Sequence, residues 1–383
     1  MINDFGGTFE GKTVLVTGHT GFKGSWLSLW LKELGATVIG YSLPAPTTPS
    51  HFSVSRIQAD VISVNGDIRD YTLFKTTLDR YQPEIIFHLA AQPIVLQSFN
   101  SPKDTFDINA GGTVNILEAA RHCPSIKAMV MVTSDKCYQN QEWIWGYRES
   151  DLLGGSDPYS ASKGMAEMAI AAYRASYSSS SPFPAIASAR AGNVIGGGDF
   201  SESRIVPDCM RALMDKQPVR LRNPNSTRPW LHVLDALSGY LNLAAHLINK
   251  GMAFASAWNF GPLEHQAISV QTLIEKGISF WGEGDWLDIS NAGIKQEMNL
   301  LRLNWDKAAA GLEWCPTYNC SEAIQQTVEW FKCYDLYRRV PCSLDMHEVS
   351  LKHLYAYTAH AKRRLQAWSL TEKVELDPCP QLG

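Results

Sequence analysis

The sequence lacks the features that mark several large protein classes. Lys and Arg (34 residues) do not outnumber Asp and Glu (38 residues), and a net charge of −4 argues against a protein that binds nucleic-acid phosphates. No apolar run approaches the roughly 20 residues that cross a bilayer. Residues 1–10 hold neither the basic cluster nor the apolar stretch of a signal peptide. We therefore expect no nucleic-acid partner and no membrane contact.

Metal-binding and disulfide patterns are absent as well. The eight cysteines include no Cys-x-x-Cys pair, and the ten histidines include no His-Glu-x-x-His pair, so we expect no metal. A chain of 383 residues of which 45% are hydrophobic builds a large core without disulfides. We therefore expect reduced thiols and a cytoplasmic protein.

Short β-branched, apolar runs alternate with helical patterns in the first half of the chain. The apolar runs predict buried strands at 12–17, 37–41, 61–64, 84–89, 128–133 and 185–190. The helical patterns predict helices at 22–34, 71–81, 105–121 and 160–177. This alternation is typical of the α/β class. It predicts a Rossmann-type, doubly wound parallel sheet with helices on both faces.

The regular alternation of strands and helices ends after about residue 192, where glycine-rich and proline-rich loops separate scattered helical patterns. We expect a dinucleotide-binding domain at 1–191, which also carries the candidate catalytic Tyr and Lys. A smaller C-terminal lobe at 192–340 is expected to be mostly substrate-binding and to return one or two strands to the sheet. In the tail at 341–383 we expect an amphipathic helix at 347–368 and a disordered final stretch at 377–380.

A glycine-rich motif, Thr17-Gly18-His-Thr-Gly21-Phe-Lys-Gly24, follows the first predicted strand and opens the first predicted helix. Glycines at these positions permit a tight turn, close approach of a pyrophosphate and close packing of helix on strand. The helix N-terminus offers unpaired N–H groups to the anion. The motif therefore predicts a dinucleotide site.

The choice between NAD and NADP stays open at this point. A dinucleotide fold usually carries an acidic residue after the second strand to bind the ribose, but residues 40–44 read Gly-Tyr-Ser-Leu-Pro. Lys23 and Arg56 are either surface residues or candidates to contact a 2′-phosphate. Asp67 either accepts a hydrogen bond from adenine or caps a turn.

A second motif, Tyr159-Ser-Ala-Ser-Lys163, places a phenol and an ammonium one helical turn apart. A nearby cation stabilises a phenolate, so this pair predicts an acid/base tyrosine with a lowered pKa, although a surface i,i+4 pair has the same spacing. Ser134-Asp135-Lys136 ends the strand predicted at 128–133.

Together these motifs resemble the extended short-chain dehydrogenase/reductase family. The resemblance covers roughly residues 10–335 and also rests on His88-Leu-Ala-Ala91, Asn109 and Trp258-Asn-Phe-Gly261. It implies cofactor contacts at Gly18, Thr20, Gly21, Phe22, Gly24, Asp67, Ile68, Leu89, Ala90, Ala91, Tyr159 and Lys163.

Within this family, Ser134-Asp135-Lys136 stands where nucleotide-sugar 4,6-dehydratases carry Thr-Asp-Glu. The segments 137–149, 153–159, 20–26 and 228–232 resemble the branch that acts on CDP-glucose. The resemblance implies an NAD-dependent, redox-neutral dehydration of CDP-glucose to CDP-4-keto-6-deoxyglucose, in deoxysugar and lipopolysaccharide biosynthesis. Lys136 departs from the pattern, because most relatives have a carboxylate base there.

The resemblance also implies a role for each catalytic residue. Tyr159 takes the proton of the sugar 4-hydroxyl, Lys163 stabilises the phenolate and holds the nicotinamide ribose, and Ser134 hydrogen-bonds the reacting oxygen. Lys136 then removes the C5 proton while Asp135 protonates the departing C6 hydroxyl. A structural Asp135–Lys136 ion pair is the alternative, since each charge favours the other.

Substrate contacts are expected at Asn193 and Arg228, with Arg204 and Arg220 as further candidates that a solvated surface explains equally well. Two other functions stay open. One is dehydration of another nucleotide sugar, such as a UDP-N-acetylhexosamine, and the other is a dinucleotide-sensing scaffold without activity. The resemblance implies a homodimer or homotetramer that pairs the helices at 105–121 and 160–177.

Overall fold

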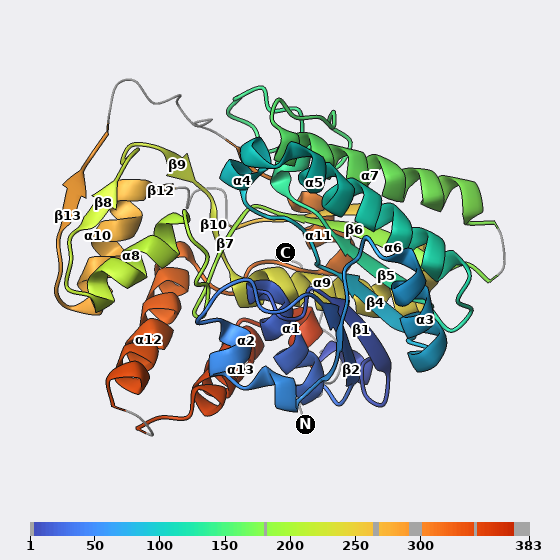
Figure 1. Ribbon diagram of the computed structural model, residues 1–383, viewed down its shortest axis with the longest axis horizontal. Coiled ribbons are helices and arrows are strands. Elements are labelled where there is room, and N and C mark those ends of the chain that lie inside the picture. The colour runs from blue at the N-terminus through green and yellow to red at the C-terminus, as the bar shows by residue number, and fades with distance from the viewer. Residues whose placement is uncertain (1–3, 180–181, 263–267, 291–300, 341–342, 371–383) are drawn as a thin grey trace, which may run out of the picture.

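A seven-stranded parallel sheet forms the centre of the computed structural model, which describes residues 4–179, 182–262, 268–290, 301–340 and 343–370 (Figure 1). The strand order is β11-β6-β5-β4-β1-β2-β3. The strands are β1 (Thr13–Thr17), β2 (Thr37–Ser42), β3 (Ile62–Asn65), β4 (Ile85–His88), β5 (Ala128–Val132), β6 (Ala185–Ala191) and β11 (Ala257–Phe260).

Both faces of this sheet are covered by helices, which explains why its strands read as continuous apolar runs. In β1, Val14 and Val16 belong to one hydrophobic core and Leu15 to the other. The helices α1 (Phe22–Glu33) and α9 (Val233–Lys250) pack on the first face, and α3 (Tyr71–Tyr81), α6 (Gly112–Arg121) and α7 (Pro158–Tyr177) cover the second. The prediction of a Rossmann-type, doubly wound sheet is confirmed.

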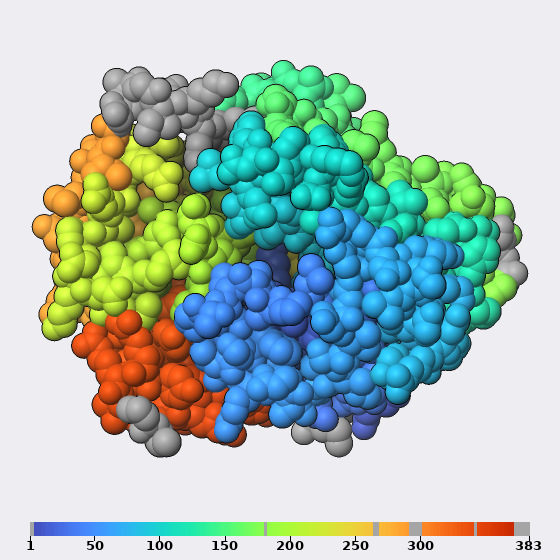
Figure 2. All heavy atoms as spheres, viewed as in Figure 1, coloured from blue at the N-terminus to red at the C-terminus, as the bar shows by residue number. Residues whose placement is uncertain are grey.

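The strand order reverses between β1 and β4, because the chain runs outward through β2 and β3 before it returns to β4. In open α/β sheets the loops at such a switch point part and leave a crevice beyond the carboxyl ends of the strands. Thr17 ends β1 and His88 ends β4, so both predicted cofactor loops begin here. Figure 2 shows the surface hollowed where the blue, cyan and yellow-green segments meet.

A smaller lobe lies to the left of the sheet in Figure 1. Its helices are α8 (Ile205–Met214), α10 (Val270–Trp281) and α12 (Cys320–Arg339). Short strands pair as β8 (Val219–Leu221) with β13 (Trp286–Asp288), β9 (Thr227–Arg228) with β12 (Ile268–Ser269), and β7 (Asn193–Ile195) with β10 (Trp230–His232). Between these elements the chain contributes α9 and β11 to the main sheet, where β11 pairs with β6.

The helix expected at 105–121 is divided into three parts. The chain forms α5 (Pro102–Phe106), a π-helical turn at Asp107–Gly111, and then α6. The Asn109 side chain lies in that turn and hydrogen-bonds Gln92 and Ser162. A π-turn widens the helix by one residue, which moves a side chain out of the regular register. Periodicity alone does not show this break.

The expected tail contributes to the main core. Helix α13 (Met346–Arg363) packs in the core that α1 also lines, where its Tyr357 ring lies 5.6 Å from the Trp30 ring, centroid to centroid. The Trp368 ring, in the 3₁₀ turn Ala367–Ser369 that follows, lies 5.8 Å from the same ring. Residues 377–380, which we expected to fray, lie outside the described residues. The remaining helices are α2 (His51–Val54), α4 (Val95–Asn100) and α11 (Asp306–Leu312). Within the described ranges, none of the helices has both the length and the apolar character required to span a bilayer.

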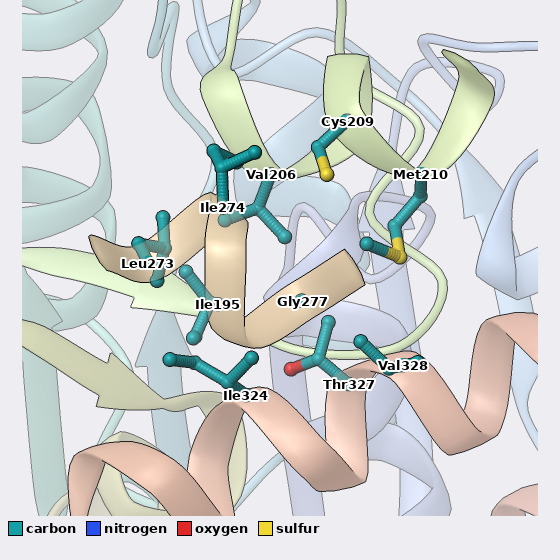
Figure 3. Close-up of a pocket in the computed structure, with 10 residues that line it drawn as sticks. All are labelled: Ile195, Val206, Cys209, Met210, Leu273, Ile274, Gly277, Ile324, Thr327 and Val328. Carbon is teal, nitrogen blue, oxygen red and sulfur yellow. The ribbon is translucent and has the colours of Figure 1, made fainter. Parts of the chain in front are cut away.

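The core of the smaller lobe contains a cavity of about 10 Å³ between α8, α10 and α12 (Figure 3). Its lining is apolar except for Thr327 and consists of Ile195, Val206, Cys209, Met210, Leu273, Ile274, Gly277, Ile324, Thr327 and Val328. A space of this size and polarity is a packing defect, too small for a ligand.

Gly277 lies in α10 beside this cavity. A methyl group at this position meets Cys209 Sγ at 3.9 Å and Met210 Cε at 4.0 Å, which are ordinary contacts. Alanine also has the higher helix propensity, so we expect Gly277→Ala to raise the free energy of unfolding by about 1 kcal/mol. Urea denaturation followed by circular dichroism measures the change.

Gly239→Ala in α9 is the matched control. A methyl group there lies 2.4 Å from a ring carbon of the buried Phe260, so the ring must move. Overpacking of this kind costs about 1–3 kcal/mol, and we expect the variant to be less stable than the wild type. A Gly277→Ala protein that is no more stable than the wild type contradicts the first expectation.

Candidate active site

The glycine-rich motif forms a tight turn between β1 and α1. Gly18 has φ +74°, and a Cβ there would lie 2.8 Å from the backbone nitrogen of Ala90. A Cβ at Gly24 would lie 2.1 Å from the carbonyl oxygen of Gly18. Only glycine fits at these two positions, and no side chain caps the N-terminus of α1. The turn therefore leaves a backbone cradle that suits the pyrophosphate of a dinucleotide.

The other predicted cofactor residues lie around this crevice. Leu89 and Ala90 donate backbone N–H groups to Thr17 Oγ1, both at 3.1 Å, so the loop after β4 is fixed to the end of β1. The Thr20 hydroxyl donates to the Leu43 carbonyl at 2.9 Å and lies 2.8 Å from Ser42 Oγ. These hydroxyls occupy the place where many relatives of the fold have an acidic residue.

Asp67 has the turn-capping geometry that the sequence left open. Its carboxylate accepts the Arg69 backbone N–H at 2.8 Å and pairs with the Arg69 guanidinium at 2.6 Å. The hydrogen bond from Arg69 holds the pKa of Asp67 below its usual value. The following residue, Ile68, is buried. Contact of Asp67 with adenine stays a prediction.

The two candidates for a 2′-phosphate lie elsewhere. The Arg56 side chain pairs with Asp345 on the approach to α13. Lys23 lies 6.0 Å from the centroid of the Tyr240 ring, and its charge interacts with Arg204, Lys163 and Asp135. Burial, aided by Arg204 and Lys163, lowers the pKa of Lys23 to about 7. Lys23 is therefore a residue of the catalytic crevice, a position that its sequence neighbours did not indicate.

Ser134, Asp135 and Tyr159 meet at the carboxyl end of β5. Ser134 follows the strand and caps a 3₁₀ turn, η4 (Asp135–Cys137), while Tyr159 and Lys163 lie on α7, which packs against this turn. The Ser134 hydroxyl donates to Asp135 Oδ1 at 2.9 Å and accepts the backbone N–H of Lys136 at 3.2 Å. All four side chains are buried. The spacing argument therefore predicted neighbours that the fold does bring together.

The expected lowering of the Tyr159 pKa does not occur in the chain itself. Burial raises the pKa of Tyr159 to about 12, opposed by the Ser134 hydrogen bond and assisted by the Asp135 carboxylate. Burial also lowers the pKa of Lys163 to about 8 and raises that of Asp135. The i,i+4 argument considered the pair alone, whereas the cost of desolvation dominates inside the protein. A raised Asp135 pKa suits a proton donor.

Lys136 lines a cavity that Asp135 and Tyr159 do not line. The cavity has a volume of about 470 Å³, and Tyr138, Gly154 and Ser160 also line it. Within the described chain, no carboxylate lies within ion-pair distance of the Lys136 ammonium, but its positive charge opposes the rise in the pKa of Asp135. The role of Lys136 as a base and the alternative of a structural interaction with Asp135 both stay predictions.

The four candidate substrate residues divide into two groups. Asn193 follows Gly192, where a Cβ would lie 2.9 Å from Asp135 Oδ2. Arg204 pairs with Asp199 at 3.3 Å, and its positive charge opposes the rise in the pKa of Tyr159. These two lie at the catalytic cluster. Arg220 is exposed on β8, and Arg228 on β9 donates to the Thr227 carbonyl at 3.0 Å. The latter two belong to the smaller lobe.

Sequence reasoning missed Tyr240 and a buried ion pair. Tyr240 lies on α9 with a buried hydroxyl that has no hydrogen-bond partner within the described chain, and its charge state is coupled to Asp135 and Tyr159. Glu167 pairs with Arg190 at 2.8 Å behind Lys163. An arginine inside the apolar run 185–191 was the available signal, because a buried charge needs a partner.

Comparison with known proteins places the chain in a family. The sequence model described as GDP-mannose 4,6 dehydratase matches residues 15–327. A CDP-glucose 4,6-dehydratase of Salmonella typhimurium is 45% identical over 331 residues, which cover 85% of this chain and 92% of that protein. A CDP-paratose 2-epimerase of Salmonella typhi is 24% identical over 83% of this chain and 98% of its own length.

Solved structures share the fold. A dTDP-glucose 4,6-dehydratase of Bacillus anthracis in complex with NAD has a TM-score of 0.71 at 24% identity, over 84% of this chain and 97% of that one. A UDP-glucose 4-epimerase of Stenotrophomonas maltophila with bound NAD has a TM-score of 0.75 at 21% identity, over 86% of this chain and 100% of that one. The chain belongs to the GDP-mannose 4,6-dehydratase family of the extended short-chain dehydrogenases/reductases.

Proposed function

We propose that this protein is an NAD-dependent nucleotide-sugar 4,6-dehydratase that converts CDP-glucose to CDP-4-keto-6-deoxyglucose and water. The observation that carries the proposal is the buried contact of Tyr159, Ser134 and Asp135 at the carboxyl end of β5. It places an acid/base phenol and a carboxylic acid beside one another, as an oxidation coupled to an elimination requires. The 45% identity to a CDP-glucose 4,6-dehydratase supports CDP-glucose as the substrate.

The residues have separate tasks in this proposal. NAD, when bound, would serve as the temporary hydride acceptor. Tyr159 accepts the proton of the sugar 4-hydroxyl, and Lys163 stabilises the phenolate and holds the nicotinamide ribose. Lys136 removes the C5 proton, which the 4-ketone has made acidic. Asp135, whose pKa is raised by burial, protonates the departing C6 hydroxyl.

The cofactor and the substrate are assigned to different parts of the chain. We assign NAD to residues 1–191, with the glycine turn holding the pyrophosphate and Thr20, Asp67 and the loop at 89–91 around the nucleoside. We assign most of the nucleotide-sugar site to residues 192–340. Asn193 and Arg204 contact the sugar diphosphate near the catalytic cluster, and Arg220 and Arg228 contribute from the smaller lobe.

Assembly is proposed from the exposed side of α6 and α7. Met165 and Met168 on α7 are 48% and 61% exposed, and Val114 on α6 is 38% exposed. Exposed apolar side chains on two adjacent helices suit packing against a second copy, in a homodimer or homotetramer. We also propose a cytoplasmic location, since the described cysteines are free thiols: Cys123, Cys137, Cys209, Cys315, Cys320 and Cys333.

Product analysis tests the function directly. We expect the NAD-loaded protein to convert CDP-glucose to a 4-keto-6-deoxy product that absorbs in alkali, with no net reduction of NAD because the hydride returns to the sugar. Parallel reactions contain UDP-glucose, dTDP-glucose or UDP-N-acetylglucosamine, and others contain NADP. Conversion of another sugar in preference to CDP-glucose contradicts the proposed substrate, and preference for NADP contradicts the proposed cofactor.

Asp135→Asn and Lys136→Ala test the elimination step. Removal of a general acid or base lowers turnover by about 10²–10⁴-fold, and we expect a loss in this range for each variant. NAD binding, measured by fluorescence titration, should be unchanged because neither side chain belongs to the glycine turn.

Lys103→Ala is the control for the elimination test. It removes an exposed lysine that pairs with Asp107 on the surface, so turnover should stay at the wild-type value. Wild-type turnover in both Asp135→Asn and Lys136→Ala would overturn the assigned roles.

A further inference from the structure

The chain between β2 and β3, residues 43–60, lies against the glycine turn. Its α-helix, α2, has only four residues and lies beside α1 and α13 (Figure 1). The Leu43 carbonyl accepts the Thr20 hydroxyl at 2.9 Å, and the Phe52 ring lies 5.3 Å from the His19 ring, centroid to centroid. Thr20 is a predicted cofactor contact. We call residues 43–60 the α2 segment, because its position affects the shape of the dinucleotide site.

His51, the first residue of α2, bridges α1 and α13. Its Nδ1 atom lies 2.8 Å from Ser25 Oγ on α1, and its Nε2 atom lies 3.1 Å from Ser350 Oγ on α13. Burial, aided by the charge of His347, lowers the pKa of His51 to about 3, so the ring is neutral at pH 7. A neutral imidazole carries one N–H, so it donates to one serine and accepts from the other. Both ring nitrogens are thereby satisfied, and α2 is attached to both helices.

The bridge ends at the start of α1, where the pyrophosphate is expected. The Ser25 hydroxyl donates to the Phe22 carbonyl at 2.9 Å, and the Ser25 backbone N–H donates to the Gly21 carbonyl at 2.9 Å. Gly21 and Phe22 are both predicted cofactor contacts. The His51 ring also stacks on the Trp26 ring, with 4.4 Å between centroids and 13° between planes. A shift of His51 therefore disturbs the first turn of α1, whose N–H groups are assigned to the anion.

Ser350 attaches α13 to the α2 segment at a second point. Its hydroxyl lies 3.0 Å from Ser55 Oγ and accepts the Trp330 indole N–H at 3.1 Å. These side chains and that of His51 are buried. Hydrogen bonds between buried groups are costly to break, because a group that loses its partner cannot turn to water.

Two further contacts hold the end of the α2 segment on α13. Asp345, which caps α13, pairs with Arg56, and His347 Nε2 lies 2.9 Å from Asp60 Oδ2. Both contacts are partly exposed to solvent, which weakens an ion pair. The buried Ser350 is therefore the main attachment. Helix α13 lies beyond residues 15–327, which the family model matches, so the family pattern does not include this attachment.

We propose that Ser350 is a positioning residue for the dinucleotide and acts through His51, which holds the α2 segment against the glycine turn. The inference rests on the proposed assignment of NAD to that turn. NAD binds the seated arrangement of the segment, so its apparent dissociation constant rises as the seated fraction falls. Tyr159 and Lys163 lie on α7, which packs on the other face of the sheet from α13. A loosened segment therefore affects cofactor binding and not the chemistry of the bound cofactor.

Ser350→Ala tests the positioning role in the full-length protein. Isothermal titration calorimetry gives the dissociation constant of NAD, and steady-state kinetics with CDP-glucose give kcat and the KM for NAD. We expect the dissociation constant and this KM to rise about tenfold, because the variant loses hydrogen bonds to buried groups. We expect kcat at saturating NAD to stay at the wild-type value. An unchanged dissociation constant, or a loss confined to kcat, overturns the proposal.

Thr358→Ala is the matched control. Thr358 is buried on the same helix, and its hydroxyl donates to the Tyr355 carbonyl at 3.1 Å, within α13. Both variants should lower the free energy of unfolding, measured by urea denaturation, but Thr358→Ala should leave the dissociation constant of NAD unchanged. If the two variants weaken NAD binding equally, a general loosening of α13 explains the effect and Ser350 has no positioning role.

A double-mutant cycle tests the path through His51. We expect His51→Ala to weaken NAD binding by itself, since it removes the bridge between the helices. In that background Ser350→Ala should have little further effect, because both substitutions remove the same contact. If Ser350→Ala raises the dissociation constant by the same factor with and without His51, Ser350 does not act through His51.

Hydrogen exchange of the wild type needs no substitution. Coupling between two sites is reciprocal, so NAD should slow amide exchange in the α2 segment and in the first turns of α13. Mass spectrometry of peptic fragments with and without NAD measures the change, and peptides from α10 in the smaller lobe give the general effect of the ligand. Slowing at residues 346–351 that does not exceed the slowing in α10 contradicts the proposal.

These measurements separate the inference from the proposed function. The titrations and the exchange experiment use NAD without a sugar. If the wild type binds NAD but converts no nucleotide sugar, the proposed function fails and the dissociation constants still decide the role of Ser350. If the wild type does not bind NAD, the cofactor assignment and the inference fail together.

Discussion

The Glu167–Arg190 ion pair is the interaction on which the geometry of the catalytic cluster depends. Glu167 lies one turn beyond Lys163 on α7, and its carboxylate accepts from Arg190 and Ser188, both on β6, and from Thr133 at the end of β5. Both carboxylate oxygens of Glu167 accept hydrogen bonds, and among the described residues Arg190 Nε alone of this pair is buried without a partner. These contacts hold the helix and the two strands in one relative position. Arg190 extends the network to the Tyr138 hydroxyl behind the turn at Asp135.

Exclusion of water gives the catalytic cluster its chemical character. The same desolvation raises the pKa of Asp135 and Tyr159 and lowers that of Lys163 and Lys23, because burial disfavours every charged form. Asp135 thereby keeps its proton to a higher pH than an exposed aspartate, and Tyr159 stays protonated at neutral pH. Burial also limits the access of solvent to these groups.

The two main parts of the chain, 1–191 and 192–340, share one sheet. Helix α9 and strand β11 come from the second part of the chain but complete the sheet of the first. Helix α13 and the 3₁₀ turn Ala367–Ser369 come from the expected tail, and their Tyr357 and Trp368 rings pack in the core with α1. The crevice is therefore built on a scaffold to which most of the chain contributes, which keeps the glycine turn and α7 at a constant separation.

Local patterns in the sequence were sufficient to predict the sheet, the glycine turn and the neighbouring positions of Tyr159 and Lys163. Each depends on a short stretch of chain: alternation of strand and helix, the restricted conformation at Gly18, and the spacing of one helical turn. Only the tertiary structure decided the direction of the Tyr159 pKa shift, the burial of Lys23 and the positions of Tyr240 and Glu167. Burial and long-range charge are set by segments distant in sequence, here β5, α7 and α9, and no local pattern encodes which of them will meet.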